Sequence, residues 1–333
     1  MTIRERVEEQ EYRILSPLAA KSREAVRLRP EEPCPLRAAF QRDRDRILHS
    51  KAFRRLKHKT QVYISPGDHY RTRMTHSLEV SQISRTIARG LLLNEDLIEA
   101  VSLGHDVGHT PFGHAGEQAI RDIVGHFSHN LQSLRVLEQL ERNGDGLNLT
   151  TLVQNAILGH TGSEPLLSLE GAVVKTADRI AYLCHDYDDG IRAGLISADD
   201  LPSVVTKVLG TRTSQMITVM VTDMIEQSAQ KPTISQSSQI RDAMDEFRNY
   251  MFETVYCAPA LQPDREKAKF VLSRLYECYY SHPDRLPWDF QERREKWGLE
   301  TVVVDYVAGL TDLYAVHLFE HFFIPSTWGG LAE

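Results

Sequence analysis

Apolar residues recur along this chain at helical spacing. Between Val80 and Leu91 they come every three or four positions, which places them on one side of an amphipathic helix over residues 75–93. His76 falls on that same apolar side, four residues before Val80. Asn94 then supplies the cap of a second helix, which runs into a His-Asp pair.

The same periodicity predicts helices over most of the remaining chain, and very little of it is typical of strands. A basic helix is expected over 37–63, followed by a turn at 65–68, where the sequence Ser-Pro-Gly-Asp disfavours helix. A polar, proline-containing stretch over 227–239 predicts an exposed loop. The sequence therefore predicts an all-α fold. The other expected helices cover residues 97–104, 116–125, 129–142, 151–159, 170–187, 199–227, 236–256, 264–280 and 299–321.

The length suits one large domain, or a core with an appended lobe. A charged segment interrupted by prolines covers residues 1–45 and precedes a predicted core over 46–195. The helical region over 196–333 has no motif of its own. We expect it to pack on the core as an additional C-terminal helical lobe.

Composition changes this picture only locally. The 333 residues are 41% hydrophobic and 26% charged, which excludes collagen-like, disordered and disulfide-scaffold proteins. The net charge of −7 argues against a general binder of polyanions. Residues 37–59 nevertheless hold nine Lys or Arg against two Asp, so an anion is expected near them. Within that segment Arg42, Arg44 and Arg46 alternate with acids, and we expect them to form a solvated or subunit-contact surface.

Other global features point to the cytoplasm. The four cysteines are scattered, with no Cys-x-x-Cys pair, which is typical of reduced thiols. The first residues include no apolar stretch of a secretory leader, and no apolar run reaches the roughly 18 residues that a membrane span requires. We therefore expect a cytoplasmic protein without a membrane partner.

Histidine is the unusual residue, because eleven of the fourteen lie within residues 49–185. His76, the pair His105-Asp106 and Asp178 all fall at positions expected to be buried, where an unpaired carboxylate would be costly. Two imidazoles and two carboxylates form a mixed nitrogen and oxygen set that suits Mn²⁺, Fe²⁺, Mg²⁺ or Zn²⁺. We expect one such ion to join the three helices and keep positions open for water.

The segment Gly104–Glu117 reads GHDVGHTPFGHAGE, and its histidines, glycines and proline make poor helix and poor strand, which predicts a functional loop. The spaced set of His76, His105-Asp106 and Asp178 matches an H…HD…D signature and so resembles the HD-domain phosphohydrolases. The longer segment HDVGHTPFGHAGE, with FSHN at 127–130, is similar to the deoxynucleoside triphosphate (dNTP) triphosphohydrolases of bacterial dGTPase type. The resemblance is close over 50–195 and extends to the whole chain in length and helical character.

The resemblance implies a metal-dependent enzyme, with Mn or Mg favoured, that hydrolyses a dNTP to the deoxynucleoside and triphosphate. His114 would protonate the leaving 5′ oxygen, and Glu117, one turn on, would orient its ring. One departure concerns the neighbours of His129, which are Ser and Asn where many relatives carry an acid. The implied metal ligands are His76, His105, Asp106 and Asp178; the implied catalytic residues are His109, His114, Glu117 and His129; and the implied substrate contacts are Arg54, Lys57, Gln61, Arg73, Tyr182 and Asp186.

The resemblance also implies partners. Family members assemble into homo-oligomers, respond to a dNTP activator and bind single-stranded nucleic acid, and the basic N-terminal third suits such anions. Two other functions stay open at this point. One is an HD phosphohydrolase for a monophosphate, cyclic or alarmone nucleotide. The other is a non-catalytic nucleotide- or nucleic-acid-binding protein with a structural metal.

Overall fold

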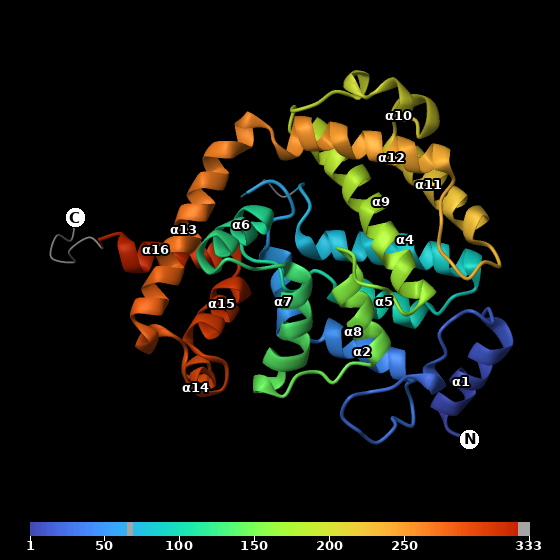
Figure 1. Ribbon diagram of the computed structural model, residues 1–333, viewed down its shortest axis with the longest axis horizontal. Coiled ribbons are helices and arrows are strands. Elements are labelled where there is room, and N and C mark those ends of the chain that lie inside the picture. Colours follow the sequence, from blue (N-terminus) through green and yellow to red (C-terminus); the bar gives the residue numbers. More distant parts are fainter. Residues whose placement is uncertain (65–68, 326–333) are drawn as a thin grey trace.

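All regular secondary structure in the residues that the computed structural model describes, 1–64 and 69–325, is helical. Within them there are no strands, and two isolated bridges join Arg27 to Thr150 and Thr60 to Thr72. The predicted all-α fold is therefore confirmed (Figure 1).

Sixteen α-helices follow one another in the described part of the chain, linked by short 3₁₀ and π turns. The first nine are α1 (Ile3–Ile14), α2 (Ala39–Leu48), α3 (Lys51–Arg55), α4 (Arg73–Leu91), α5 (Glu95–Gly104), α6 (Gly113–Val124), α7 (His129–Arg135), α8 (Thr151–Gly159) and α9 (Leu169–Arg192). The remaining seven are α10 (Ser203–Val208), α11 (Thr213–Ser228), α12 (Ser238–Met251), α13 (Gln262–Ser281), α14 (Trp288–Trp297), α15 (Leu299–Gly309) and α16 (Asp312–Phe323).

Helices α4, α5 and α9 pack against one another at the centre of the fold. Local sequence fixes where the first two begin. The hydroxyl of Thr72 accepts a hydrogen bond from the Thr75 amide at the start of α4, and the Asn94 side chain accepts one from the Leu97 amide at the start of α5. The predicted apolar side of α4, including Val80, is buried. These two helices hold the His76 and His105 positions at adjoining ends.

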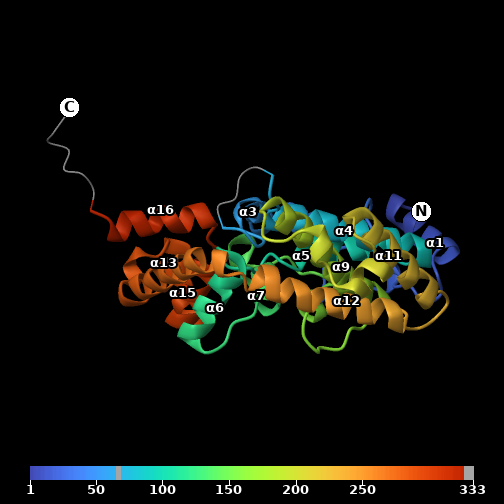
Figure 2. The same ribbon diagram turned by 90° about the horizontal axis from the view of Figure 1, so that it is seen from above.

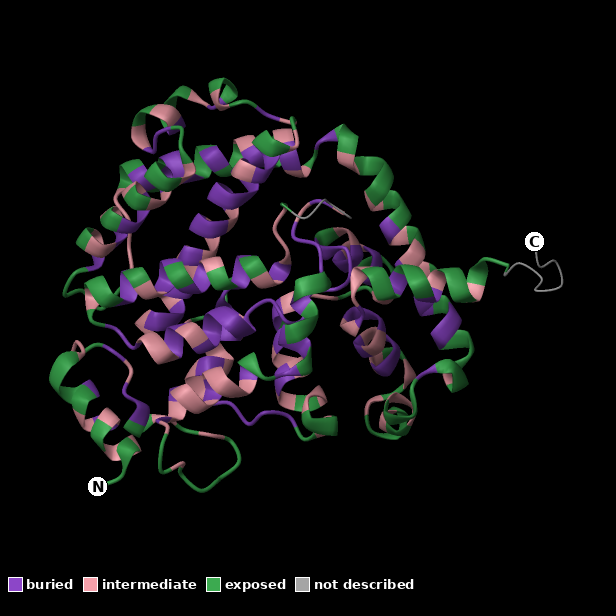
Figure 3. Cartoon of the chain, turned by 180° about the vertical axis from the view of Figure 1, so that it is seen from behind, coloured by how far each residue is buried: buried purple, intermediate pink, exposed green. Residues whose placement is uncertain are grey.

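The buried apolar side chains form two clusters. The larger cluster joins α2, α4, α5, α8 and α9 to α11 and α12, as in the pairing of Tyr187 with Phe247. The smaller cluster joins α6 to α13, α15 and α16, around Ile120 and Leu272. Figures 1 and 2 show the helices of the smaller cluster at one end of the molecule, and Figure 3 shows their buried faces turned inward. Both clusters draw residues from each side of residue 195. The domain limits at 45 and 195 stay predictions.

The basic helix expected over 37–63 is wrong in its extent. It breaks after Leu48, because Ser50 caps a separate short helix by accepting from the Phe53 amide, and it ends with a 3₁₀ turn at Leu56–His58. The turn predicted at 65–68 lies outside the described residues.

Two other long helices are also divided. The one expected over 199–227 breaks at Gly210, where φ is 93°. The one expected over 299–321 breaks because Thr311 caps α16 by accepting from the Tyr314 amide. The loop expected over 104–117 is shorter than predicted, since α6 already begins at Gly113.

The alternating arginines do not form a purely solvated surface. Arg46 donates to the carbonyls of Leu147 and Asn148, and its side chain is only 10% exposed. Arg44 pairs with Asp96 at 2.8 Å. Arg46 therefore bonds backbone oxygens of the same chain instead of facing only solvent, and the subunit contact stays a prediction.

No single described helix is both long and apolar enough to cross a membrane. By length and composition alone, α15 and α16 pass that test together as a pair bent by 117°.

Candidate functional site

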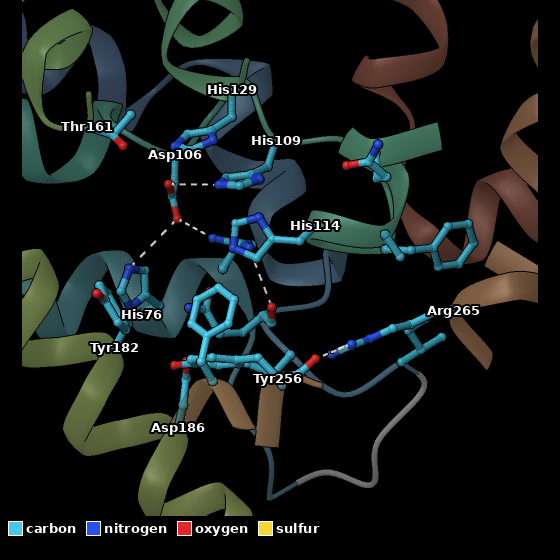
Figure 4. A pocket seen from close by; sticks show the side chains of 18 of the residues that line it. His76, Asp106, His109, His114, His129, Thr161, Tyr182, Asp186, Tyr256 and Arg265 are labelled. Carbon is cyan, nitrogen blue, oxygen red and sulfur yellow. Dashed lines mark hydrogen bonds and ion pairs between the residues drawn. The ribbon is translucent and has the colours of Figure 1, made fainter. Parts of the chain in front are cut away.

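A cavity of about 550 Å³ opens between the two apolar clusters. Its walls come from α4, the loop between α5 and α6, the helices α6, α7 and α9, and from the C-terminal region at α12 and α13. Figure 4 shows the histidines, carboxylates and tyrosines that point into it.

The four residues predicted as metal ligands meet at the inner end of this cavity. Nε2 of His76 lies 3.0 Å from Oδ1 of Asp178 and 3.8 Å from Oδ2 of Asp106. Nε2 of His105 lies 3.4 Å from Oδ1 of Asp106 and 3.8 Å from Oδ1 of Asp178. The structure thus brings together one residue from α4, two from the end of α5 and one from α9.

The tautomer of His105 suits this set for metal binding. Its Nδ1 donates to the Ser102 carbonyl at 2.7 Å, which leaves Nε2 with a lone pair. That Nε2 is buried and has no hydrogen-bond partner among the described residues. Burial would raise the pKa of Asp106, but the neighbouring imidazoles and the Arg73 guanidinium hold it well below its ordinary value. An ionised carboxylate beside a free imidazole nitrogen is a donor set that a divalent cation fits.

Arg73 lines the cavity, but its guanidinium is engaged by the protein. Nη1 donates to Oδ2 of Asp106 at 2.9 Å, and Nε donates to the Thr60 carbonyl at 3.1 Å. The side chain is 3% exposed. Arg73, which was predicted to contact the substrate, therefore also orients Asp106 within the metal set, that is, the four predicted ligands His76, His105, Asp106 and Asp178.

The four predicted catalytic residues form one connected group beside the metal set. The rings of His109 and His129 stack with centroids 4.0 Å apart, and Nε2 of His109 lies 3.2 Å from Oδ1 of Asp106. Oε2 of Glu117 lies 3.2 Å from Nδ1 of His129 and 3.7 Å from Nδ1 of His114. The side chain of His114 is 73% exposed and points into the cavity (Figure 4).

Glu117 is held in its ionised form. Burial raises its pKa, but the contacts with His114 and His129 and the charge of His109 outweigh burial and keep that pKa far below the ordinary value. Arg121 adds a hydrogen bond of 2.8 Å to the other carboxylate oxygen. The carboxylate can therefore accept hydrogen bonds from two imidazoles and fix their orientation.

His160 is part of this group, although we assigned it no role from the sequence. Its Nδ1 donates to the Ile157 carbonyl at 2.7 Å, so its Nε2 is an acceptor, 3.2 Å from Nε2 of His129. Burial lowers the pKa of His160 to about 3, so the ring is neutral near pH 7. Its position in a glycine-flanked loop after α8 was the only sequence signal.

Tyr182 and Asp186, which were predicted as substrate contacts, also line the cavity. Asp186 is buried and accepts 2.7 Å from the hydroxyl of Tyr256, and Tyr182 lies one turn before it on α9. Gln61 lines the same space, and its buried Oε1 has no partner among the described residues. These groups offer both a donor and acceptors for a bound molecule.

Two predicted substrate contacts are not brought to the cavity within the single chain. Arg54 and Lys57 are exposed and do not line it. The neighbouring Arg55 instead donates to the Gly309 carbonyl at 3.1 Å. The helix break after Leu48 turns this short basic stretch toward the C-terminal region.

Besides Arg73, three cations of the C-terminal region line the cavity: Arg248 from α12, and Arg265 and Lys269 from α13. Sequence reasoning missed them. Arg265 and Lys269 are four residues apart and so share a helix face, but this spacing is common on solvated helices and carries no specific signal. Arg265 also donates to the Tyr256 carbonyl.

The glycine in the His-Asp-Val-Gly-His motif lets two backbones meet. A methyl group on Gly108 would lie 2.1 Å from the Ser133 amide nitrogen and 2.5 Å from the His129 carbonyl oxygen. Gly108 also donates its own amide to the Ser133 hydroxyl. The motif loop therefore packs directly on α7, which brings His109 and His129 into contact.

Two family models match the chain. The model of the HD domain matches residues 73–183, and the model of the phosphohydrolase-associated domain matches residues 234–321. Together they include the metal set and the C-terminal cations.

Several curated proteins are similar over nearly the whole chain. A deoxyguanosinetriphosphate triphosphohydrolase-like protein of Caldanaerobacter subterraneus is 52% identical over 332 residues, which covers 98% of each chain. Proteins with the same name from Desulfatibacillum aliphaticivorans (45% identical, 98% of this chain and 99% of the relative) and Clostridium perfringens (46%, 98% of each) also match. Among solved structures, a phosphohydrolase from Bacteroides thetaiotaomicron has a similar fold, with a TM-score of 0.52 and 18% identity, over 83% of this chain and 68% of that one.

Proposed function

The chain belongs to the HD-domain hydrolases that include the deoxyguanosinetriphosphate triphosphohydrolase-like proteins, and we propose that it hydrolyses dNTPs to the deoxynucleoside and triphosphate in a metal-dependent reaction. The observation that carries this proposal is the His/Asp set, buried except for the Asp178 side chain at 20% exposure, at the end of a cavity whose adjoining wall holds the His114–Glu117 pair.

His76, His105, Asp106 and Asp178 would hold the metal ion. When bound, a divalent cation such as Mn²⁺ or Mg²⁺ supplies Lewis acidity at a phosphate and offsets the charge of the two carboxylates. Ser102 fixes the lone pair of His105, and Arg73 fixes one oxygen of Asp106, so the protein determines how the donors point.

In the proposed reaction, a water oxygen bonds to the α-phosphorus and releases a proton to the solvent, and the bond from that phosphorus to the 5′ oxygen breaks. His114 gives the leaving oxygen a proton, because its exposed ring points into the cavity and Glu117 orients it. Such proton donation contributes roughly 10²–10⁴ in rate. His109 and His129, stacked behind, stabilise the negative charge that develops on the phosphate oxygens.

The rest of the cavity fits the other parts of a dNTP. Arg248, Arg265 and Lys269 would offset the charge of the phosphates. Asp186 and Tyr256 would bond a deoxyribose hydroxyl, and Tyr182 would pack on the sugar ring. A monophosphate or a cyclic nucleotide would leave the cations of α12 and α13 without a partner, which favours a triphosphate.

Product analysis tests this proposal. The protein is incubated with each dNTP and Mn²⁺ or Mg²⁺, and the products are resolved by ion-exchange chromatography, with a chelated sample as the control. Equal amounts of deoxynucleoside and triphosphate support the proposal. Formation of dNMP and pyrophosphate, turnover of monophosphates alone, or full activity after chelation contradicts it.

The partners implied by the resemblance stay predictions of their own. We propose a homo-oligomer, activation by a second dNTP and binding of single-stranded nucleic acid as properties to measure beside turnover. Light scattering with and without dNTP tests the first two, and a salt-dependent shift of labelled single-stranded DNA tests the third.

A further inference from the structure

The corner between α15 and α16 is bonded to both chain segments that form one wall of the cavity. Oδ1 of Asp312, the first residue of α16, accepts from the Phe112 amide at 2.9 Å. Oδ2 accepts from the Thr60 amide at 2.9 Å and from the Thr60 hydroxyl at 2.5 Å. One carboxylate therefore joins the motif loop to the segment that carries Gln61.

A buried lysine makes the second connection at the same corner. The Lys59 side chain is 2% exposed, and its ammonium donates to the Ala308 carbonyl at 2.9 Å and to the His109 carbonyl. Ala308 lies in the last turn of α15, four residues before Asp312. Lys59 thus holds the backbone of a predicted catalytic histidine against the C-terminal region.

The backbone that Asp312 holds is in an unusual conformation. Phe112 has φ 61° and ψ 22°, in the left-handed region that a bulky side chain rarely adopts and that costs on the order of 1–3 kcal/mol. It is the cap residue of α6 but offers no capping side chain. The bond from its amide to Asp312 therefore supports a conformation that sets the direction of α6, the helix carrying His114 and Glu117.

The motif loop and the segment before α4 also touch directly. A methyl group on Gly113 would lie 3.2 Å from the Thr60 carbonyl oxygen, so the two backbones are in close contact there. The same Thr60 carbonyl accepts from Nε of Arg73, which in turn bonds Asp106. A displacement at this contact would therefore move both His114, the predicted acid, and the metal set.

We propose that Asp312 and Lys59 are positioning residues, which fasten the α15–α16 corner to the motif loop and so hold His109 and the start of α6 in the geometry needed for catalysis. The kinetic part of this inference rests on the proposed function, whereas the structural part does not. Neither side chain lines the main cavity, so neither contacts the substrate.

The test compares three variants. Asp312→Asn keeps one carbonyl acceptor but loses the second oxygen, Thr60→Val removes only the hydroxyl donor, and Lys59→Met keeps the apolar stem without donors. We expect kcat to fall by on the order of 10- to 100-fold in Asp312→Asn and Lys59→Met, because small displacements of catalytic groups have such effects. KM should stay within about threefold of the wild type, since the cavity contacts remain.

Asp43→Asn is the matched control. Asp43 is also a buried aspartate that accepts from a backbone amide, that of Thr150, and from an arginine, but it lies away from the cavity. We expect it to lower stability without the kcat loss. Hydrogen exchange of residues 106–114 supplies a readout that needs no turnover. It should speed up in Asp312→Asn and Lys59→Met and stay unchanged in Asp43→Asn.

The outcomes separate the two proposals. Unchanged kcat and unchanged exchange of 106–114 in folded Asp312→Asn and Lys59→Met would overturn the positioning roles. If the wild type hydrolyses no dNTP, the proposed function fails, but the exchange measurement still decides whether the corner holds the loop. If Asp312→Asn does not fold, the milder Thr60→Val decides: faster exchange in 106–114 supports the proposal and wild-type exchange contradicts it.

Discussion

The carboxylate of Asp186, on α9, accepts a hydrogen bond of 2.7 Å from the hydroxyl of Tyr256, which follows α12. This bond connects the motif-bearing helices to the C-terminal region at the wall of the cavity (Figure 4). Burial raises the pKa of Asp186 to about 7, and the bond from Tyr256 offsets that rise only in part. Asp186 therefore bears both on the proposed substrate contact and on the stability of the fold.

Asp186 should make stability depend on pH. Between about pH 4 and about pH 7, the folded state keeps a proton on Asp186 that the unfolded chain has already released. The free energy of unfolding therefore falls as pH rises through that window. In Asp186→Asn this contribution disappears. Urea unfolding at about pH 5 and about pH 8 should show a smaller drop in the variant, by on the order of 1.4 kcal/mol for each pH unit between about 5 and about 7. Equal drops in both proteins would contradict the buried proton.

Mutations in the metal set and at the proton donor should have different effects on metal binding. Asp106→Ala removes a shared carboxylate of the set, so we expect loss of both metal binding and turnover. His114→Ala should keep the metal and lose roughly 10²–10⁴ in turnover, because its ring lies outside the set. Bound metal is measured by elemental analysis after dialysis. Normal turnover in His114→Ala would remove this residue from the mechanism.

Gly108 should not tolerate even a methyl group. In Gly108→Ala the added carbon would overlap the backbone of α7, so we expect displacement of His129, lower thermal stability and loss of most activity. Gly125→Ala is the control: its φ is 78°, but a methyl there meets nothing within 4 Å, so only strain of about 1 kcal/mol is expected. Thermal unfolding and turnover of the two variants check the difference. Similar behaviour would show that close packing is not the reason for Gly108.

The cations on α13 should affect substrate binding. Replacing Arg265 and Lys269 together by alanine should raise KM for a dNTP roughly tenfold or more and change kcat less. The reason is that the attraction between these cations and the phosphates is lost from the ground state and the transition state alike. Lys267→Ala, on the same helix, is the control, since Lys267 is exposed and pairs with Asp264. Steady-state kinetics at two salt concentrations check this. An equal change in the control would assign the effect to general charge.

Local sequence determined the central helices and was enough to predict the metal ligands. The cap Asn94 and the apolar side of α4 follow from capping and periodicity, and the limits of α8 follow from periodicity alone, since these signals involve residues within one or two turns of each other. His76, His105, Asp106 and Asp178 stood out because their residue types are costly to bury alone, and the structure places each of the two histidines within 3.0–3.8 Å of both carboxylates.

Tertiary structure decided what the remaining polar residues contact. Arg73 faces Asp106, His160 faces His129, Arg46 faces carbonyls, and α12 and α13 bring their cations to the cavity. Each of these contacts joins segments separated by many residues, so neither spacing nor composition specifies it. Periodicity predicts which side of a helix is buried. Only the packing of α4, α9 and α13 around one cavity determines which groups each buried side chain contacts.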